Sequence, residues 1–158
     1  MTDFFIKKLK IFGKGKETST VDFTNGLNIV CGPSNTGKSY IVEIIDFLFG
    51  SSRVPFDKTL GYDTFEMDVK TSRGQITVRR QIDARKEKVI SSDPSIESGD
   101  YGTTSGTLNV NEDLWLKLMG IENRHQVIRN HLFEKQRLTI RSILHMVLIK
   151  EDNVIQRP

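Results

Sequence analysis

The feature that most constrains this chain is an eight-residue glycine-containing segment near its N-terminus. The segment reads Gly32-Pro33-Ser34-Asn35-Thr36-Gly37-Lys38-Ser39 and matches G-x-x-x-x-G-K-[ST] at every fixed position. Its glycines let backbone N–H groups turn inward and surround phosphate oxygens. Because such a loop works between a buried strand and a helix, the sequence predicts an α/β fold of the P-loop NTPase type.

The residues on either side of the loop fit that arrangement. Leu27–Cys31 is a short apolar run, which predicts a strand buried inside a mixed or parallel core sheet, with Cys31 as a small core residue. Asn25-Gly26 before it predicts a tight turn. Ser39–Phe49 is apolar almost all round, which predicts a deeply packed helix capped by Gly50.

Alternating patterns predict an antiparallel β lobe beside this core. Phe4–Ile11 and Ser19–Phe23 are typical of half-buried strands. The segment 65–82 alternates apolar and polar residues on both sides of Ser72-Arg73-Gly74, which predicts a hairpin with Gly74 in the left-handed conformation.

The rest of the chain is less regular, and we find no internal repeat. Residues 83–107 are polar and predict turns, with a mobile loop at 98–106. Asn111 is expected to cap a helix over 112–119, residues 125–133 favour a strand, and Thr139 is expected to cap a last short helix.

The chemistry of the loop predicts a nucleotide site that takes ATP and Mg²⁺. Lys38 can reach the β- and γ-phosphates and is the predicted catalytic residue, and Ser39 can offer its hydroxyl to Mg²⁺. The helix that starts here points its positive end at the anion. The predicted nucleotide-binding residues are Gly32, Pro33, Ser34, Asn35, Thr36, Gly37, Lys38, Ser39 and Tyr40.

Composition narrows the class of protein. A net charge of +3 over 158 residues is compatible with a DNA partner, and Arg79-Arg80 and the basic run 85–88 could meet its phosphates. The three histidines lack metal-ligand spacing. No apolar run is long enough to span a membrane, so a cytoplasmic protein without a membrane partner is expected.

Residues 5 to 50 resemble the N-terminal half of the ATPase head in the SMC/RecN/SbcC group of ABC-type ATPases. The hairpin at 65–82 is similar to the antiparallel lobe of that group. The matching pieces are Ile6-Lys7-Lys8-Leu9-Lys10-Ile11, Val21-Asp22-Phe23, Asn25-Gly26-Leu27-Asn28-Ile29-Val30-Cys31-Gly32, Asn35-Thr36-Gly37-Lys38-Ser39 and Ile44-Ile45-Asp46-Phe47-Leu48-Phe49-Gly50.

The resemblance implies that residues 1–158 form one partial ATPase domain, truncated before a coiled coil. In the family a second head half supplies the signature motif and the Walker B acidic pair, and neither is found in this sequence. The fragment alone is therefore expected to bind nucleotide poorly and to hydrolyse it slowly, because the carboxylate that activates water is missing. The implied partners are the C-terminal head half and a second head bound through ATP, in DNA repair, chromosome maintenance or phage defence.

The resemblance also implies two further sets of site residues. Lys14 and Lys16 lie where the family places a basic loop near the nucleotide. The family's glutamine loop aligns with residues 145–152, where Glu151 or Lys150 replaces glutamine, so Glu151 is a candidate Mg²⁺ ligand. Gln136 and Gln156 are alternatives if the register is shifted.

Two other functions fit the loop. One is a different P-loop enzyme, such as a small kinase or GTPase, although the sequence holds no lid arginines and no Asn-Lys-x-Asp motif. The other is a nucleic-acid-binding module with a vestigial P-loop. A preference for GTP would favour the first, and DNA affinity without nucleotide binding would favour the second.

Overall fold

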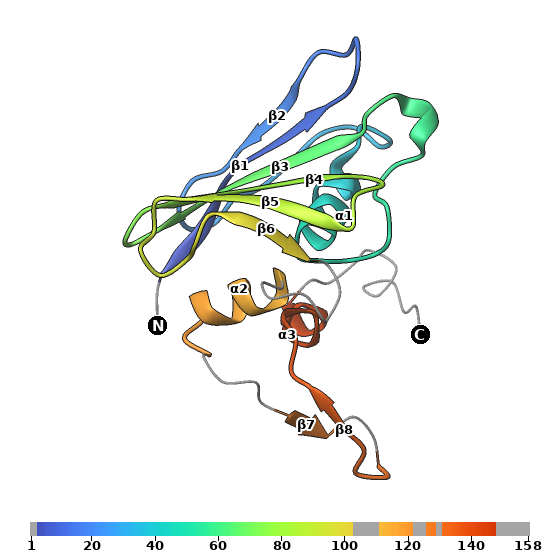
Figure 1. Ribbon diagram of the computed structural model, residues 1–158. Coiled ribbons are helices and arrows are strands. Elements are labelled where there is room, and N and C mark those ends of the chain that lie inside the picture. The colour runs from blue at the N-terminus through green and yellow to red at the C-terminus, as the bar shows by residue number, and fades with distance from the viewer. Residues whose placement is uncertain (1–2, 103–110, 122–125, 129–130, 148–158) are drawn as a thin grey trace.

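The computed structural model describes residues 3–102, 111–121, 126–128 and 131–147. Its main element is a six-stranded sheet with the strand order β2-β1-β3-β4-β5-β6 (Figure 1). The strands are β1 (Phe4–Phe12), β2 (Ser19–Asp22), β3 (Thr64–Thr71), β4 (Gln75–Gln81), β5 (Lys86–Ser91) and β6 (Gly99–Gly102). All five pairings between neighbours in this sheet are antiparallel. Among these residues no helix is long and apolar enough to cross a membrane.

Alternation along the strands decides which face of the sheet is covered. Phe65, Met67 and Val69 of β3 point to the inner face and are fully buried, as are Ile76 and Val78 of β4. Because side chains alternate along a strand, the residues between them reach the opposite face. There Glu66 and Asp68 both accept from Lys10, at 2.7 Å and 3.1 Å. The inner face therefore carries the core and the outer face carries charge.

The helix that follows the glycine loop packs on the inner face. This helix, α1 (Lys38–Leu48), lies beneath the sheet in Figure 1, and the Phe47 ring meets the Phe65 ring at a centroid distance of 5.4 Å. Gly50 takes φ of 100° and its N–H donates to the Phe47 carbonyl. The predicted helix and its glycine cap are confirmed, because this position requires the left-handed conformation that glycine adopts freely.

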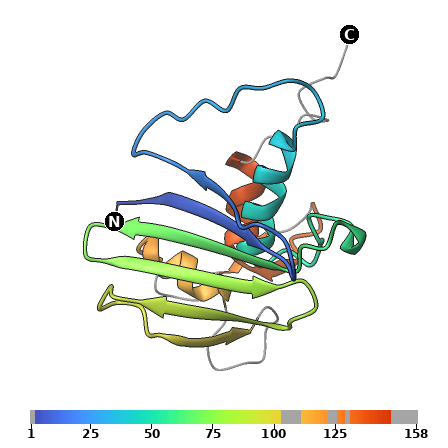
Figure 2. The same ribbon diagram turned by 90° about the horizontal axis from the view of Figure 1, so that it is seen from above.

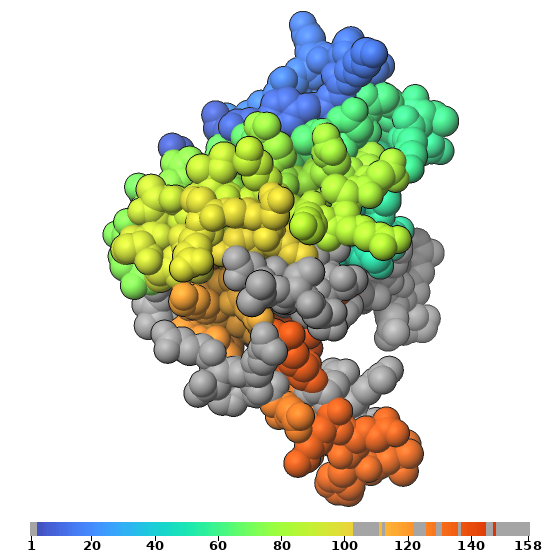
Figure 3. Space-filling view, viewed as in Figure 1, coloured from blue at the N-terminus to red at the C-terminus, as the bar shows by residue number. Residues whose placement is uncertain are grey.

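Two further helices and a small hairpin lie on the same side of the sheet. They are α2 (Asn111–Leu118), α3 (Ile140–Val147), β7 (Gln126–Ile128) and β8 (Lys135–Arg137). Trp115 of α2 is fully buried and packs on Phe49 with ring centroids 4.3 Å apart, and Arg141 of α3 pairs with Asp46 of α1 at 3.2 Å. The β7–β8 hairpin projects away from the rest of the described chain (Figure 3). The helices thus fasten the far half of α1 to the C-terminal part of the chain.

The strand predicted over Leu27–Cys31 is wrong, and with it the predicted mixed or parallel core sheet. No described strand pairs with this segment, which arches away from the sheet between β2 and α1 (Figure 2). Leu27, Ile29 and Val30 are 86%, 76% and 48% exposed, and Cys31 is exposed rather than a core residue. An apolar run forms a strand only when a neighbour satisfies its backbone groups, and the described residues hold no such neighbour.

Two smaller predictions also need correction. The region expected to be turns and mobile loop contains β5 and β6. The alternation of β5 is hidden because one of its two buried residues, Glu87, is an acid. Gly74 does not take a positive φ. Its need for glycine is steric, because an added Cβ would lie 2.7 Å from the Asp93 nitrogen.

Of the two helix caps predicted later in the chain, one is confirmed and one is wrong. Asn111 begins α2, but its side-chain NH₂ donates to the Leu48 carbonyl and to Glu87 rather than capping its own helix. Thr139 does cap α3, accepting from the Ser142 N–H at 3.3 Å. The predicted strand over 125–133 is confirmed at Gln126–Ile128 and is wrong at residues 131–133, which lie outside any strand, whereas residues 125, 129 and 130 lie outside the described ranges.

Candidate nucleotide-binding site

The glycine loop turns sharply just before α1. Asn35 has φ of 60° and Gly37 has φ of 85°, so two of three consecutive residues take the left-handed conformation. Asparagine tolerates this conformation better than most residues, and glycine tolerates it without cost. The Thr36 hydroxyl donates to the Pro33 carbonyl at 2.8 Å and closes the turn. The loop is therefore a curved backbone rather than an extended one at residues 34–37.

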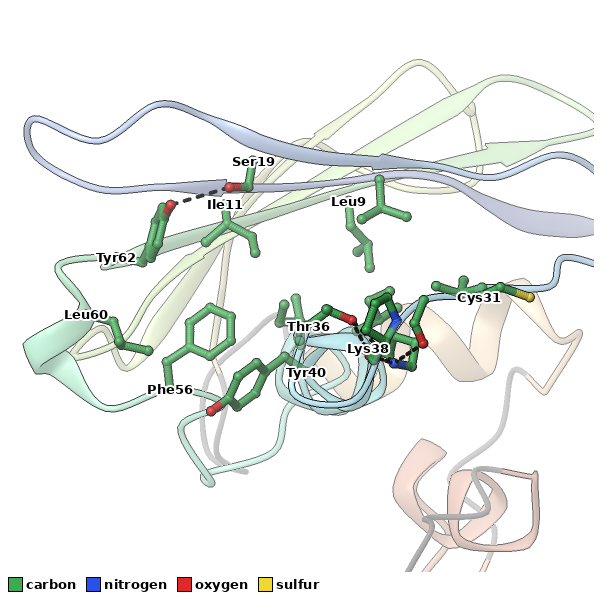
Figure 4. Close-up of a pocket in the computed structure, with 17 residues that line it drawn as sticks. Leu9, Ile11, Ser19, Cys31, Thr36, Lys38, Tyr40, Phe56, Leu60 and Tyr62 are labelled. Carbon is green, nitrogen blue, oxygen red and sulfur yellow. Dashed lines mark hydrogen bonds between the residues drawn. The ribbon is translucent and has the colours of Figure 1, made fainter.

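The Lys38 side chain folds back over this loop. Its ammonium donates to the Gly32 carbonyl at 2.9 Å, to the Pro33 carbonyl, and to the Thr36 hydroxyl at 3.3 Å (Figure 4). The positive charge thus lies against the loop and does not extend into solvent. A phosphate group that reaches the loop would meet this ammonium at once and could replace the carbonyls as its acceptor.

The first turn of α1 is open to an anion. Gly37 at the N-cap provides no side-chain hydrogen bond, and no acidic residue lies in the first turn. A helix N-terminus leaves N–H groups without intrahelical partners and carries a partial positive charge. Ser39 is exposed at this position, where its hydroxyl can reach a metal ion held by phosphates.

Two hollows adjoin the loop. One, of about 610 Å³, is lined entirely by residues 34–40 and is the one that phosphates would enter. The other, of about 630 Å³, lies between the sheet and α1 (Figure 4). Its seventeen lining residues are Leu9, Ile11, Ser19, Val21, Val30, Cys31, Gly32, Pro33, Thr36, Gly37, Lys38, Tyr40, Ile41, Ile44, Phe56, Leu60 and Tyr62.

The basic residues expected beside the nucleotide occupy the β1–β2 turn. Lys14 and Lys16 are both exposed there, and the Lys16 N–H donates to the Gly13 carbonyl at 3.1 Å. The Lys16 side chain lies over Gly61, since a Cβ added at Gly61 would be 3.0 Å from the Lys16 Cε. Gly61 precedes Tyr62, which lines the larger hollow. Lys16 is therefore near one end of that hollow.

Only some of the predicted metal ligands lie within the described residues. Ser39 has been placed above, whereas Glu151, Lys150 and Gln156 lie outside the described residues. Within the described ranges no group of three His, Cys, Asp or Glu side chains is placed to hold a metal ion. Any Mg²⁺ at this site would therefore depend on the nucleotide's phosphates and Ser39 for the ligands described here.

A buried polar cluster that the sequence did not predict lies at the other end of α1. Arg80 donates to the carbonyls of Phe47 and Ser51 at 2.6 Å and 2.9 Å, and lies 3.3 Å from Glu87. Burial raises the pKa of the Glu87 carboxyl to about 8, with Arg80 opposing the shift. Asn111 completes the cluster through Glu87 and the Leu48 carbonyl. These groups fix the C-terminal end of α1 to β4, β5 and α2.

The same cluster removes Arg80 from the residues that could contact DNA. Arg80 is buried under the sheet and cannot reach a polyanion, and Glu87 within the basic run 85–88 is buried too. Arg79 faces the other side of the sheet, where it pairs with Glu66. Lys86 and Lys88 remain exposed on that side. Arg79 and Arg80 thus lie on opposite faces of β4, because side chains alternate along a strand.

Comparison with known proteins agrees with this geometry. The chain is 35% identical over 78 residues to the Septu protein PtuA of Bacillus thuringiensis. That match covers 48% of this chain and 20% of the relative, so the chain corresponds to about a fifth of the length of that protein. A family model described as an AAA domain matches residues 5–154. This match spans nearly all of the sequence, and the chain therefore belongs to the AAA domain family of P-loop ATPases.

Proposed function

We propose that this chain is the ATP-binding N-terminal part of an SMC/RecN/SbcC-like ATPase head. The observation that carries the proposal is the placement of Lys38 and the uncapped first turn of α1 around one hollow lined by residues 34–40. Members of the family bind ATP with Mg²⁺. In this chain Lys38 would hold the β- and γ-phosphates, the backbone of residues 34–40 would surround them, and Ser39 would ligate Mg²⁺.

The first proposed partner is the C-terminal half of the ATPase head. Leu27 and Ile29 are exposed apolar side chains on a segment outside the helices and strands, and the backbone there pairs with no described strand. Burying that surface and pairing that backbone would both be favourable. A strand from a C-terminal head half would do both, and it would also bring the carboxylate that activates water for hydrolysis.

A second head is the other proposed partner. Ser34, Asn35, Thr36 and Ser39 are exposed, so nucleotide bound at the loop would remain open to an opposing surface. Two heads would then sandwich ATP, and binding would close them while hydrolysis would release them. A protein with this mechanism would act in DNA repair, chromosome maintenance or phage defence. It would do so in the cytoplasm, and ATP binding and hydrolysis would move an attached coiled coil.

Titration of ATP in the presence of Mg²⁺ tests the proposal. Lys38→Ala should weaken ATP binding by about 100-fold or more, because the triphosphate would lose its charge-assisted partner. Lys88→Ala is the matched control, since it removes an exposed lysine on the outer face of the sheet. Equal ATP affinity in Lys38→Ala and Lys88→Ala would contradict the assignment. A preference for GTP over ATP of more than about tenfold would favour a GTPase instead.

A further inference from the structure

Three aromatic rings gather at one end of the larger hollow. They are Tyr40 from α1, Phe56 from the segment after it, and Tyr62 just before β3 (Figure 4). Tyr40 and Phe56 meet edge to face with centroids 4.5 Å apart, and Phe56 and Tyr62 are 6.3 Å apart. Phe56 also packs on the core residue Phe65 at 5.5 Å. The cluster is therefore anchored to the sheet at its centre.

The cluster is continuous with the phosphate loop. Gly37 and Lys38 line the same hollow as the three rings, and Tyr40 lines both this hollow and the one formed by residues 34–40. Because Tyr40 lines both hollows, a nucleotide whose phosphates lie at residues 34–40 could extend its base past Tyr40 into the larger hollow. The volume of about 630 Å³ falls within the usual range for small-molecule sites.

The chemistry of the lining favours a flat apolar group. None of the seventeen lining residues carries a carboxylate or a carboxamide, the side chains that pair with base edges. On the strand side the Ser19 and Tyr62 hydroxyls lie 3.4 Å from each other. Aromatic faces, in contrast, stack on any base. The hollow thus offers stacking surface but few groups to distinguish one base from another.

We propose that the cluster of Tyr40, Phe56 and Tyr62 is the seat of the nucleobase, and that it binds a purine by stacking without reading its edge. This inference rests on the proposed function, and it adds how the same site would bind the base of the nucleotide. ATP and GTP should therefore bind with affinities within about tenfold of each other, because discrimination between related ligands needs polar groups aimed at their differences.

Binding of three ligands in the presence of Mg²⁺ separates this proposal from the phosphate site. The ligands are ATP, GTP and inorganic tripolyphosphate, titrated into the protein, Tyr62→Ala and Tyr62→Phe. Tyr62→Ala should weaken ATP and GTP by roughly tenfold, as loss of one stacking face does elsewhere, and leave tripolyphosphate unchanged. Tyr62→Phe keeps the ring and should bind all three like the unmodified protein.

Each other outcome overturns the proposal. Unchanged ATP and GTP binding in Tyr62→Ala, with tripolyphosphate still bound, would refute the proposed base site and would leave the proposed phosphate site unaffected. Parallel loss of tripolyphosphate in Tyr62→Ala would mean that the ring supports the loop rather than the base. A preference above tenfold for either purine would show edge recognition. Failure of the unmodified protein to bind tripolyphosphate would refute the phosphate site and the base seat together.

Discussion

At the scale of single residues, Lys38 and Ser39 divide the work of the proposed site. The Lys38 ammonium donates to loop carbonyls and could donate to phosphate oxygens instead. Ser39 is exposed at the first turn of α1, where its hydroxyl can reach a metal ion. The two side chains should therefore fail in different ways when they are removed, one through the anion and the other through the metal.

Ser39→Ala should reduce the dependence of ATP binding on Mg²⁺, because the metal loses a protein ligand while the phosphate contacts remain. Calorimetric titrations with and without Mg²⁺ would measure this difference. Ser34→Ala, which removes another exposed loop hydroxyl, should keep the full Mg²⁺ dependence. An identical Mg²⁺ requirement in Ser39→Ala and the unmodified protein would refute the role given to Ser39.

Glu87 should make stability depend on pH. Its pKa is raised from 4.5 to about 8 by burial, so the folded protein retains a proton that the unfolded chain releases in this range. The free energy of unfolding should therefore fall as pH rises from about 4.5 to about 8. Glu87→Gln should flatten that slope, measured by urea unfolding at several pH values. An unchanged slope would mean that Glu87 is ionised in the folded protein.

At the scale of elements, the turn between β3 and β4 illustrates what the sequence could predict. The hairpin was predicted correctly from the alternation on both sides of Ser72-Arg73-Gly74, but the left-handed conformation predicted for Gly74 was wrong. The steric reason for glycine could not be predicted, because the clash involves Ser92 and Asp93, which are distant in sequence. Patterns reveal local geometry, whereas contacts between distant segments leave no mark in a window of a few residues.

Gly74→Ala should destabilise the protein by about 1–3 kcal/mol, because its methyl group would press on the backbone of Ser92 and Asp93. Gly99→Ala in β6 is the matched control, since a Cβ there meets no atom within 4 Å. Thermal or urea unfolding of the two variants measures the contrast. Equal stability of the two variants would show that the turn relaxes freely and that the close approach is unimportant.

The same limit explains the errors at β5, β6 and Leu27–Cys31. Glu87 breaks the apolar alternation of β5, yet it is buried because Arg80 and Asn111 meet it. Conversely, Leu27–Cys31 has the composition of a buried strand but no described partner strand. A strand depends on its neighbours as much as on its own residues, and a single sequence does not show which neighbours are present.

At the scale of the whole molecule, α1 joins the proposed site to the rest of the chain. Its first turn faces the hollow at residues 34–40, and its last turn is held by Arg80 and Asn111. The glycine loop and its helix could be predicted from the sequence, because the motif is local. The aromatic cluster could not, since Tyr40, Phe56 and Tyr62 follow no regular spacing and meet only through the fold.

Nucleotide should stabilise the whole fold and not only the loop. Trp115 is the single tryptophan and is buried in α2 far along the chain, so its fluorescence reports unfolding of the body. ATP with Mg²⁺ at 100 times its dissociation constant should add about 2.7 kcal/mol of stability and raise the melting temperature. Lys38→Ala should show no such rise. A melting temperature insensitive to ATP in the unmodified protein would indicate that the folded chain has no nucleotide site.

Amide hydrogen exchange would show whether the backbone of residues 34–40 surrounds the phosphates of ATP. Exchange would be followed by mass spectrometry in the protein with and without saturating ATP and Mg²⁺. We expect slower exchange in peptides that cover residues 34–41, with no comparable change over β5 and β6. Unchanged exchange at residues 34–41, with protection only elsewhere in the chain, would show that ATP does not bind to this loop.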